Sequence, residues 1–309
     1  MIAVVGGYGV GLTMRLPRSP RAGETVASGV LSSDHGGKGS NQAVAVRRLG
    51  VASLIITALG EDDAATEARR FWADEGVADR AVELAGSRTM TGFIMVDSEG
   101  ENRICVADGA LAELVPEALE GRLDGIGPGD IVLVSLEIPT DVAAWALRVA
   151  RESGARTVLN PAPVAAHTSA LLQYADVLTP NRSELAVLAG LPEPQGADEV
   201  AACCASLRAS TGYAGELIVT LGAAGAHVDD GKGDLIPPIQ ISEVVDTTGA
   251  GDAYSAALAV ALHEGASARE AAHFASAAGA LAVTQERVIP ALPYRADVDR
   301  LDESRTRST

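Results

Sequence analysis

The stretch Asp246-Thr247-Thr248-Gly249-Ala250-Gly251-Asp252 contains the residue types needed to hold an anion beside a base. Two glycines flank one small residue, and the apolar run that continues to Leu262 predicts a buried helix that begins here. The first backbone N–H groups of a helix have no intrahelical acceptor, and the helix dipole adds partial positive charge, so this end favours an anion. Gly249 and Gly251 would let the backbone approach that anion closely.

Asp252 has two interpretations. A carboxylate in the first turn of a helix can simply be favourable helix-end electrostatics, which contributes about 0.3–1 kcal/mol. Alternatively, the N–H groups of the helix start hold a transferring phosphoryl group while Asp252 takes the proton of the attacking hydroxyl. The choice depends on whether the rest of the chain supplies sites for an acceptor, a nucleotide and a metal ion.

A second glycine cluster, His35-Gly36-Gly37-Lys38-Gly39-Ser40-Asn41, also opens an apolar stretch that predicts a helix to about Leu49. Ser40 or Asn41 could simply cap that helix. Three glycines around one lysine exceed what a cap requires, however. We therefore expect the backbone of this cluster to lie close to a ligand.

Two further motifs follow predicted strands. Asn181 and Glu184 are three residues apart, which fits an N-cap with its capping-box partner. The same amide and carboxylate could instead orient a hydrated Mg²⁺ at a phosphate chain, because Mg²⁺ keeps waters and takes few protein ligands. Thr220-Leu221-Gly222-Ala223-Ala224-Gly225 suits nucleotide phosphates or an ordinary turn between strands.

Composition excludes several classes of function. The 309-residue chain carries 24 basic and 41 acidic residues, and its net charge of −17 opposes nonspecific binding to nucleic acid. No basic region precedes the first apolar run, and no apolar run approaches the roughly 20 residues of a membrane span. We therefore expect a cytoplasmic protein that binds neither nucleic acid nor membranes. Cys105, Cys203 and Cys204 fit neither a disulfide framework nor a metal site, and the adjacent pair predicts helix packing.

The elements that must position these residues alternate between apolar strands and helices, which predicts a parallel sheet covered on both faces. In such sheets ligands gather at the carboxyl ends of the strands. The predicted strands span residues 2–7, 53–58, 131–135, 157–159, 177–179 and 217–221. Polar residues lie at or just beyond several strand ends: Glu137, Asn160, Asn181, Thr220 and Asp246. Two β excursions, at 12–34 and around the hairpin 89–107, interrupt this alternation.

Together these motifs resemble the ribokinase family of carbohydrate and nucleoside kinases, also called the phosphofructokinase B family. The resemblance runs from Ile2 to about Pro293, and its most specific marks are 36–43 and 246–252, with Asn181/Glu184 and Thr220/Gly222 in the same order between them. Within the family, 20–25, 136–137 and 160–163 are most similar to the ribokinase members. The resemblance implies a three-layer α/β/α sandwich with a mostly parallel sheet and a small β-sheet lid.

The resemblance also implies an activity, the ATP-dependent phosphorylation of a primary hydroxyl on a small sugar. Asp252 would be the general base, and the backbone of Gly249, Ala250 and Gly251 would form the anion hole. The nucleotide would lie at Asn181, Thr220, Gly222 and Gly225, and Mg²⁺ would be held through water by Glu184 and Asn181. The acceptor would face Gly37, Lys38, Asn41, Glu137, Gly11 and Asp34.

The implied domains are an α/β catalytic domain of residues 1–11, 35–87 and 109–300 and a β lid of residues 12–34 and 88–108. The lid would exclude water, which competes with the acceptor hydroxyl for ATP. Its exposed sheet face commonly makes a dimer in this family, so we expect a homodimer. The charged tail, 301–309, predicts disorder.

Two departures from the family pattern affect these expectations. Ribokinase-like sequences follow the first strand with an Asn-x-Asp that holds sugar hydroxyls, whereas this chain has Gly9 and Gly11. Loss of a hydrogen-bonding carboxylate should select strongly against the original ligand. We hypothesise that Asp34 or His35 replaces part of that contact, or that the acceptor is bulkier or differently hydroxylated.

The second departure concerns a monovalent cation beside the anion hole. Asp246 and Thr248, which the resemblance assigns to that cation, are present. The later loop has Arg287 where ribokinase-like sequences have glycine and Ala291 where they have serine. We therefore expect weak or absent activation by K⁺.

Other functions compete with this interpretation. A nucleoside kinase on the same fold differs only in its acceptor, and a nucleotide-binding protein without catalysis would not need Asp252. A dinucleotide oxidoreductase is disfavoured because Gly7, Gly9 and Gly11 have spacing two rather than the G-x-G-x-x-G pattern.

Overall fold

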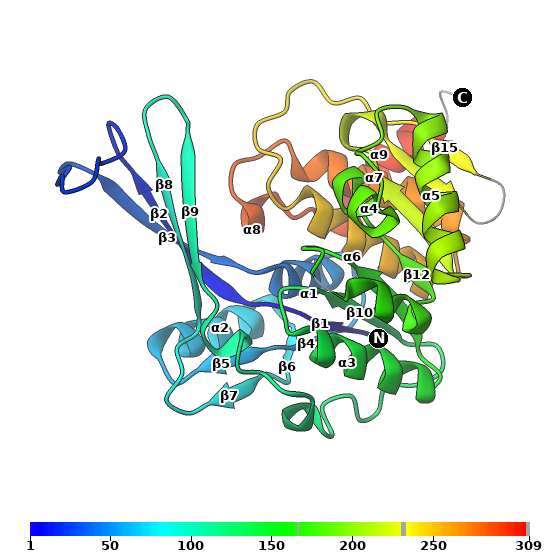
Figure 1. Cartoon of the computed structure of the whole chain (residues 1–309), viewed down its shortest axis with the longest axis horizontal. Coiled ribbons are helices and arrows are strands. Elements are labelled where there is room, and N and C mark those ends of the chain that lie inside the picture. The colour runs from blue at the N-terminus through cyan, green and yellow to red at the C-terminus, as the bar shows by residue number, and fades with distance from the viewer. Residues whose placement is uncertain (166, 230–232, 307–309) are drawn as a thin grey trace.

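The computed structural model describes residues 1–165, 167–229 and 233–306. In this part of the chain the central feature is a nine-stranded sheet in the order β15-β14-β13-β12-β11-β10-β1-β4-β6 (Figure 1). Neighbouring strands from β13 to β6 are parallel, whereas β14 is antiparallel to both of its neighbours, β13 and β15. The strands are β1 Ile2–Val5, β4 Ser53–Ile56, β6 Ala78–Asp79, β10 Ile131–Ser135, β11 Arg156–Asn160, β12 Val177–Leu178, β13 Glu216–Thr220, β14 Ala226–Asp229 and β15 Asp234–Ile236. The predicted mostly parallel sheet is confirmed.

Helices cover both faces of this sheet because side chains of each strand alternate between two cores. Val4 of β1 belongs to the core under α1, α2, α6, α7 and α9, and Val5 to the core under α3, α4 and α5. The helices are α1 Lys38–Arg48, α2 Asp63–Glu75, α3 Thr140–Glu152, α4 Arg182–Ala189, α5 Ala197–Thr211, α6 Ala250–His263, α7 Ala268–Ala282, α8 Val288–Ala291 and α9 Arg295–Thr306. Cys203 and Cys204 are buried in α5, as the sequence predicts.

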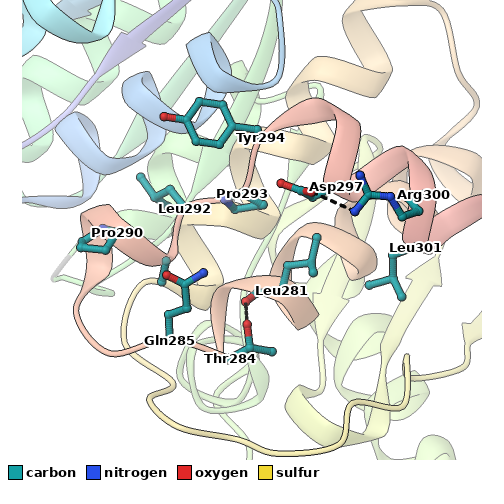
Figure 2. A pocket seen from close by; sticks show the side chains of 11 residues that line it. Leu281, Thr284, Gln285, Pro290, Leu292, Pro293, Tyr294, Asp297, Arg300 and Leu301 are labelled. Atoms are coloured by element: carbon teal, nitrogen blue, oxygen red, sulfur yellow. Dashed lines mark hydrogen bonds and ion pairs between the residues drawn. The ribbon is translucent and has the colours of Figure 1, made fainter.

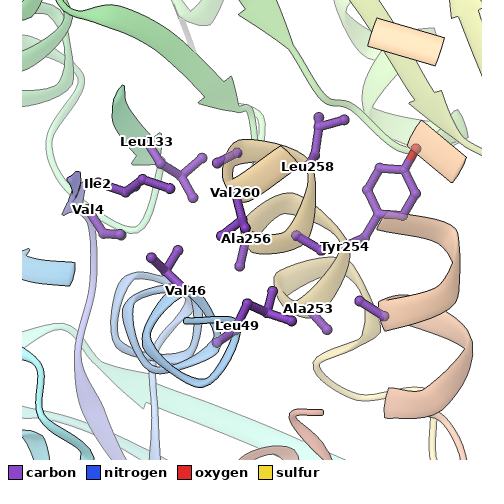
Figure 3. Close-up of a cluster of buried hydrophobic side chains, with 14 of the residues drawn as sticks. Ile2, Val4, Val46, Leu49, Leu133, Ala253, Tyr254, Ala256, Leu258 and Val260 are labelled. Atoms are coloured by element: carbon purple, nitrogen blue, oxygen red, sulfur yellow. The ribbon is translucent and has the colours of Figure 1, made fainter. Parts of the chain in front are cut away.

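The core that contains Val4 determines the positions of α1 and α6, the two helices whose first residues carry the glycine motifs. Figure 3 shows Val46 of α1 and Val260 of α6 directed toward Val4 and Leu133 of the sheet. Helix α6 is rich in alanine, and α1 contributes Ala43 and Ala45 to the same core, so small residues fill much of the contact. This packing brings the beginnings of α1 and α6 to the same edge of the sheet.

A separate four-stranded sheet stands beside this core (Figure 1), in the order β3-β2-β8-β9. Its strands are β2 Gly9–Arg15, β3 Val30–Gly36, β8 Met90–Val96 and β9 Asn102–Ala107. The two predicted β excursions therefore do form one sheet, which we call the lid. The lid sheet extends beyond the predicted segment 12–34, because β2 begins at Gly9 and β3 ends at Gly36. A further pair, β5 Ala58–Gly60 and β7 Val82–Leu84, lies at its base.

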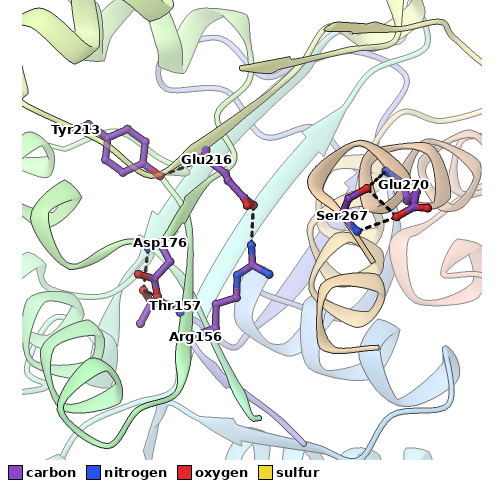
Figure 4. A network of polar contacts seen from close by, with 7 residues as sticks. All are labelled: Arg156, Thr157, Asp176, Tyr213, Glu216, Ser267 and Glu270. Atoms are coloured by element: carbon purple, nitrogen blue, oxygen red, sulfur yellow. Dashed lines mark hydrogen bonds and ion pairs between the residues drawn. The ribbon is translucent and has the colours of Figure 1, made fainter. Parts of the chain in front are cut away.

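The strand ends opposite the motifs are tied by polar contacts (Figure 4). Arg156, at the start of β11, forms an ion pair of 2.6 Å with Glu216, at the start of β13. The Asp176 carboxylate accepts hydrogen bonds from the backbone N–H and the hydroxyl of Thr157, both at 2.9 Å. These contacts stabilise the sheet far from the glycine motifs.

The C-terminal end differs from expectation. We predicted disorder for 301–309, but helix α9 continues through Thr306, and 307–309 lie outside the described residues. Ion pairs one turn apart, Arg295–Asp299 at 2.8 Å and Arg300–Asp297 at 3.3 Å, support this charged helix. Among the described helices we find none with the length and apolarity needed to span a bilayer.

Candidate active site

The carboxylate of Asp252 lies in the first turn of α6, and the residue is only 5% exposed. Its Oδ2 accepts a hydrogen bond of 2.8 Å from Nδ2 of Asn41, and its Oδ1 accepts one of 3.1 Å from Nε2 of Gln42. Burial raises the pKa of Asp252, while the nearby Lys38 ammonium and the two amide donors oppose that rise. A carboxylate with a raised pKa is a stronger base than an ordinary aspartate.

Asn41 and Gln42 both hold the Asp252 carboxylate through their amide nitrogens. We predicted that Asn41 faces the acceptor, and this stays a prediction: its Nδ2 donates to Asp252, whereas its Oδ1 has no hydrogen-bond partner among the described residues. Gln42, which the sequence gave no reason to single out, is fully buried and also donates a 3.1 Å hydrogen bond to Oδ1 of Asn160. Asn160 in turn donates to the carbonyl of Thr179 at 3.1 Å. These side chains fix the orientation of the Asp252 carboxylate.

Glu137 and Lys38 meet at the start of α1. The backbone N–H of Lys38 donates a 2.6 Å hydrogen bond to Oε2 of Glu137. Burial raises the pKa of Glu137, and that hydrogen bond and the Lys38 charge oppose the shift. The Lys38 ammonium also opposes the rise in the pKa values of Asp252 and Glu184 that burial causes. It therefore lies within electrostatic reach of all three carboxylates.

The glycine cluster at the start of α1 has a packing role that the sequence did not reveal. Gly37 has φ 89°, and a Cβ there would lie 2.6 Å from the carbonyl oxygen of Gly7. A Cβ on Gly39 would lie 2.7 Å from Cα of Gly6. These two glycines are therefore needed where the start of α1 packs against the protein's own chain between β1 and the lid, and close approach of the cluster to a ligand stays a prediction.

The start of α6 has the geometry expected of an anion site. Gly249 is the N-cap with φ 82°, and a Cβ there would lie 2.5 Å from Cγ1 of Val288. The N–H of Ala250 makes a weak turn contact of 3.3 Å to the Thr247 carbonyl, and the first helical bond runs from Ala253 to Gly249. The N–H groups of Gly251 and Asp252 lie in the first turn, where a helix supplies no acceptor.

Asn181, Glu184, Thr220 and Gly222 come together at the same sheet edge, because Asn181 and Thr220 form a parallel bridge. The capping box predicted as one alternative is present: Oδ1 of Asn181 accepts from the N–H of Glu184, and Oε2 of Glu184 accepts from the N–H of Asn181, both at 2.8 Å. Gly225 has φ 93° and closes the turn after β13. Burial is the main cause that raises the pKa of Glu184.

These residues fit Mg²⁺ only through water. In the described chain no group of three or more His, Cys, Asp or Glu residues is arranged to hold a metal ion. Glu184 is a single carboxylate with one oxygen committed to its capping box. Such a residue suits the second shell of a hydrated Mg²⁺, which keeps several waters and takes one or two carboxylates.

Asp246 organises the loop before the anion site. Its Oδ1 accepts hydrogen bonds from the N–H of Thr248 at 2.9 Å and from the Thr248 hydroxyl at 2.7 Å. Its Oδ2 accepts a 3.3 Å hydrogen bond from the N–H of Arg287. These three bonds lower the pKa of Asp246 against the effect of burial. Both carboxylate oxygens are therefore in use where a monovalent cation was considered.

The residues considered as replacements for the missing Asn-x-Asp lie on opposite faces of the lid. Asp34 is paired with Gly11 in the strand register and forms an ion pair with Arg287. His35 points to the other face, where its Nδ1 lies 2.9 Å from the hydroxyl of Tyr8 and its ring stacks on Phe71 at 4.2 Å between ring centroids. Only Asp34 therefore remains available as a replacement.

A pocket of about 570 Å³ lies elsewhere, between the end of α7 and helices α8 and α9 (Figure 2). It contains none of the predicted site residues. Several of its polar groups bond within the protein: Asp297 pairs with Arg300 at 3.3 Å, and the Thr284 hydroxyl donates a 2.7 Å hydrogen bond to the Leu281 carbonyl. We assign no chemistry to it.

Comparison with known proteins agrees with this geometry. Residues 7–295 match the family described as pfkB family carbohydrate kinase. The ribokinase of Haemophilus influenzae is 33% identical over 300 residues, which cover 95% of each chain. The crystal structure of ribokinase from Thermotoga maritima superposes with a TM-score of 0.87 at 29% identity, over 98% of this chain and 99% of that one. The structure of Arabidopsis thaliana ribokinase complexed with ribose and ATP gives a TM-score of 0.87 at 29% identity, over 98% of each chain.

Proposed function

Since this chain belongs to the pfkB family of carbohydrate kinases and is an ATP-dependent carbohydrate kinase, we propose that it phosphorylates a primary hydroxyl of a small sugar with Asp252 as general base. The observation that carries the proposal is the buried Asp252 carboxylate in the first turn of α6, held by two amide donors. The ribose and ATP in the Arabidopsis thaliana complex support a pentose acceptor and ATP as donor.

In the proposed step, Asp252 accepts the proton of the acceptor hydroxyl as its oxygen forms a bond to the γ-phosphorus of ATP. The bond between that phosphorus and the bridging oxygen breaks, and ADP leaves with the electron pair. The fixed positions of Asn41 and Gln42 keep the carboxylate aimed, so little reorganisation is needed when the hydroxyl arrives.

Two groups would stabilise the transferring phosphoryl. The N–H groups at the start of α6, at Gly249, Ala250 and Gly251, form the proposed anion hole. The Lys38 ammonium, which acts electrostatically on both Asp252 and Glu184, would add positive charge near the phosphoryl group. In a protein of net charge −17, such local donors are required to bind a triphosphate.

Mg²⁺ is part of the proposal, with Asn181 and Glu184 orienting its waters. When bound, it would neutralise charge on the β- and γ-phosphates. Thr220, Gly222 and Gly225, at the end of β13, would contact the nucleotide, and Gly37, Lys38 and Glu137 the acceptor. We propose no monovalent cation, because Asp246 already accepts bonds from Thr248 and Arg287 on both of its oxygens.

We further propose that the lid makes a homodimer. Its strands expose large apolar side chains, which a lone soluble chain seldom gathers in one place. Three of these lie on the face that carries Asp34, Val30 at 68%, Ile104 at 58% and Val106 at 54% exposure, and Leu31 at 56% lies on the opposite face.

The test is ADP release from Mg-ATP with pentoses, hexoses, ketoses, polyols and nucleosides as acceptors. Turnover with an acceptor that bears a primary hydroxyl, and phosphate found on that hydroxyl, would support the proposal. ATP binding without turnover on any acceptor would favour a noncatalytic nucleotide-binding protein.

A further inference from the structure

Arg287 connects the lid to the loop that leads into the proposed anion site. Its guanidinium forms an ion pair with Asp34 of β3, on the lid sheet. Its backbone N–H donates a 3.3 Å hydrogen bond to Oδ2 of Asp246, and Oδ1 of that carboxylate accepts hydrogen bonds from Thr248. One residue therefore joins a lid strand to the segment from which α6 begins.

Arg287 itself belongs to the side of the main sheet. It immediately precedes α8, the short helix that contacts the lid strand β3 (Figure 1). Arg48 of α1 donates hydrogen bonds to the carbonyls of Ile289 at 2.7 Å and Leu292 at 3.0 Å. These bonds tie α8 to a helix that packs on the main sheet. The ion pair of Arg287 with Asp34 is thus a contact between the lid and the rest of the molecule.

The next residue, Val288, lies against the start of α6. A Cβ on Gly249, the N-cap of that helix, would lie 2.5 Å from Cγ1 of Val288. Arg287 and Val288 therefore contact the loop 246–252 at two places. Because close-packed groups transmit displacement, a shift of Arg287 would reach the N–H groups proposed to receive the phosphoryl group.

The backbone of Arg287 has a conformation that glycine normally adopts. Its φ is 69° and its ψ is 149°, a combination that other residues rarely adopt because the side chain crowds the backbone. Ribokinase-like sequences have glycine at this position. Strained residues persist where the surrounding contacts hold them, and they are frequent at active sites and ligand clamps. The arginine therefore indicates a use for its guanidinium that glycine would not supply.

Building on the proposed function, we propose that Arg287 is a positioning residue that couples closure of the lid to the order of the anion site. When the lid lies against α8, the guanidinium of Arg287 holds Asp34 while its N–H holds Asp246. The acceptor favours this position of the lid and thereby favours the ordered loop 246–252, at which the triphosphate binds. Because such coupling is reciprocal, the acceptor and the nucleotide should raise each other's affinity by the same factor.

The exposure of the ion pair suits a contact that forms and breaks. The side chain of Arg287 is 59% exposed and that of Asp34 is 27% exposed. Water and salt screen such charges, so the pair adds little to stability and can separate when the lid opens. The coupling between acceptor and nucleotide should accordingly weaken as ionic strength rises.

The test is titration calorimetry of the ATP analogue AMP-PNP with Mg²⁺, in K⁺-free buffer, without and with saturating D-ribose. In the wild type we expect D-ribose to lower the Kd of AMP-PNP at least about fivefold. Arg287→Gly keeps the N–H that binds Asp246 and suits the positive φ, but it lacks the guanidinium. In this variant we expect the effect of D-ribose to fall below about twofold, with the Kd of AMP-PNP alone unchanged.

Two results of these titrations would overturn the inference. Equal Kd values with and without D-ribose in the wild type would show that the two sites are not coupled. An equal weakening of AMP-PNP binding with and without D-ribose in Arg287→Gly would assign Arg287 to the structure of the loop alone.

The partner of Arg287 needs a test of its own, because Asp34 could instead contact the acceptor. Asp34→Asn, Arg287→Gln and the double variant should lose the coupling to the same extent, because each removes the same contact. Asp234→Asn, which breaks an ion pair of similar exposure with Arg269, is the matched control and should keep the wild-type coupling. If Asp34→Asn weakens binding of D-ribose alone and Arg287→Gln does not, Asp34 contacts the acceptor and the inference fails.

ADP release from Mg-ATP by the same proteins separates this inference from the proposed function. If another sugar of the panel has a higher kcat/KM, it replaces D-ribose in the titrations. Turnover of the sugar without coupling refutes only the role of Arg287, whereas absence of turnover with every acceptor refutes the kinase function.

Discussion

Gln42 gives the sharpest test of how the base is tuned. Its Nε2 donates to Asp252 at 3.1 Å, inside a fully buried setting, and so favours the charged carboxylate. We predict that Gln42→Leu, which keeps the side-chain volume but removes the donor, raises the pKa of Asp252 further. A hydrogen bond to a charged group contributes about 1.5–3 kcal/mol. At 1.36 kcal/mol per factor of ten, the ionised fraction of Asp252 below its pKa falls about 10- to 150-fold.

The assay is the pH dependence of kcat/KM. The base must be ionised, so kcat/KM falls as pH drops through the pKa of Asp252, and in Gln42→Leu this acid limb should move to higher pH. Rates on the plateau above the limb should change little. Thr57→Val removes a buried hydroxyl in the same core that has no partner among the described residues, so it controls for general repacking. An acid limb that stays in place or moves to lower pH would refute the reasoning.

Three further predictions concern the frame around the site. Gly39→Ala should lower the free energy of unfolding in urea by about 1–3 kcal/mol, because its Cβ would lie 2.5 Å from the backbone of Gly6. Gly251→Ala is the control, because its Cβ would meet nothing within 4 Å, and it should leave the free energy of unfolding equal or higher. Equal losses in both variants would contradict the packing account. Replacing Na⁺ with K⁺ should leave kcat unchanged, because Asp246 is occupied by Thr248 and Arg287; a several-fold rise would show that a cation site exists. Val30→Asp should convert the proposed dimer to a monomer in sedimentation velocity, whereas Val187→Asp, at a valine of similar exposure on α4, should not; a wild-type monomer would end the dimer proposal.

Sequence reasoning succeeded where chemistry is local. The strand and helix alternation predicted the sheet, and the motifs at 36–43 and 246–252 predicted the family. The capping box at Asn181 and Glu184 was also foreseen as one of two alternatives, because its geometry depends on only four residues.

The remainder depends on tertiary docking. Gln42 reaches Asp252 only because α1 packs against α6 with a particular rotation, which no periodicity within α1 encodes. The packing role of Gly37 and Gly39 was not foreseen for a related reason: the chain that crowds them is about thirty residues away in sequence. Arg287 and Asp34 are separated by 253 positions, so their pairing had no sequence signal.

Composition misled us at the C-terminus. Charged residues rich in serine and threonine predicted disorder after Leu301, yet α9 continues through Thr306 from a first part, before Leu301, in which Arg295 and Arg300 pair with neighbouring aspartates. Charges spaced three or four residues apart were the available signal.

The most direct measurement is kcat for ADP release by Asp252→Asn on the best acceptor, beside wild type and Asp176→Asn. The control replaces a carboxylate at the opposite sheet edge, where it accepts hydrogen bonds from Thr157 and pairs with Arg151 at 3.8 Å. We predict that Asp252→Asn lowers kcat about 10²- to 10⁴-fold without weakening ATP binding, while Asp176→Asn keeps wild-type kcat. Wild-type kcat in Asp252→Asn would contradict the assignment of the base and, with it, the proposed mechanism.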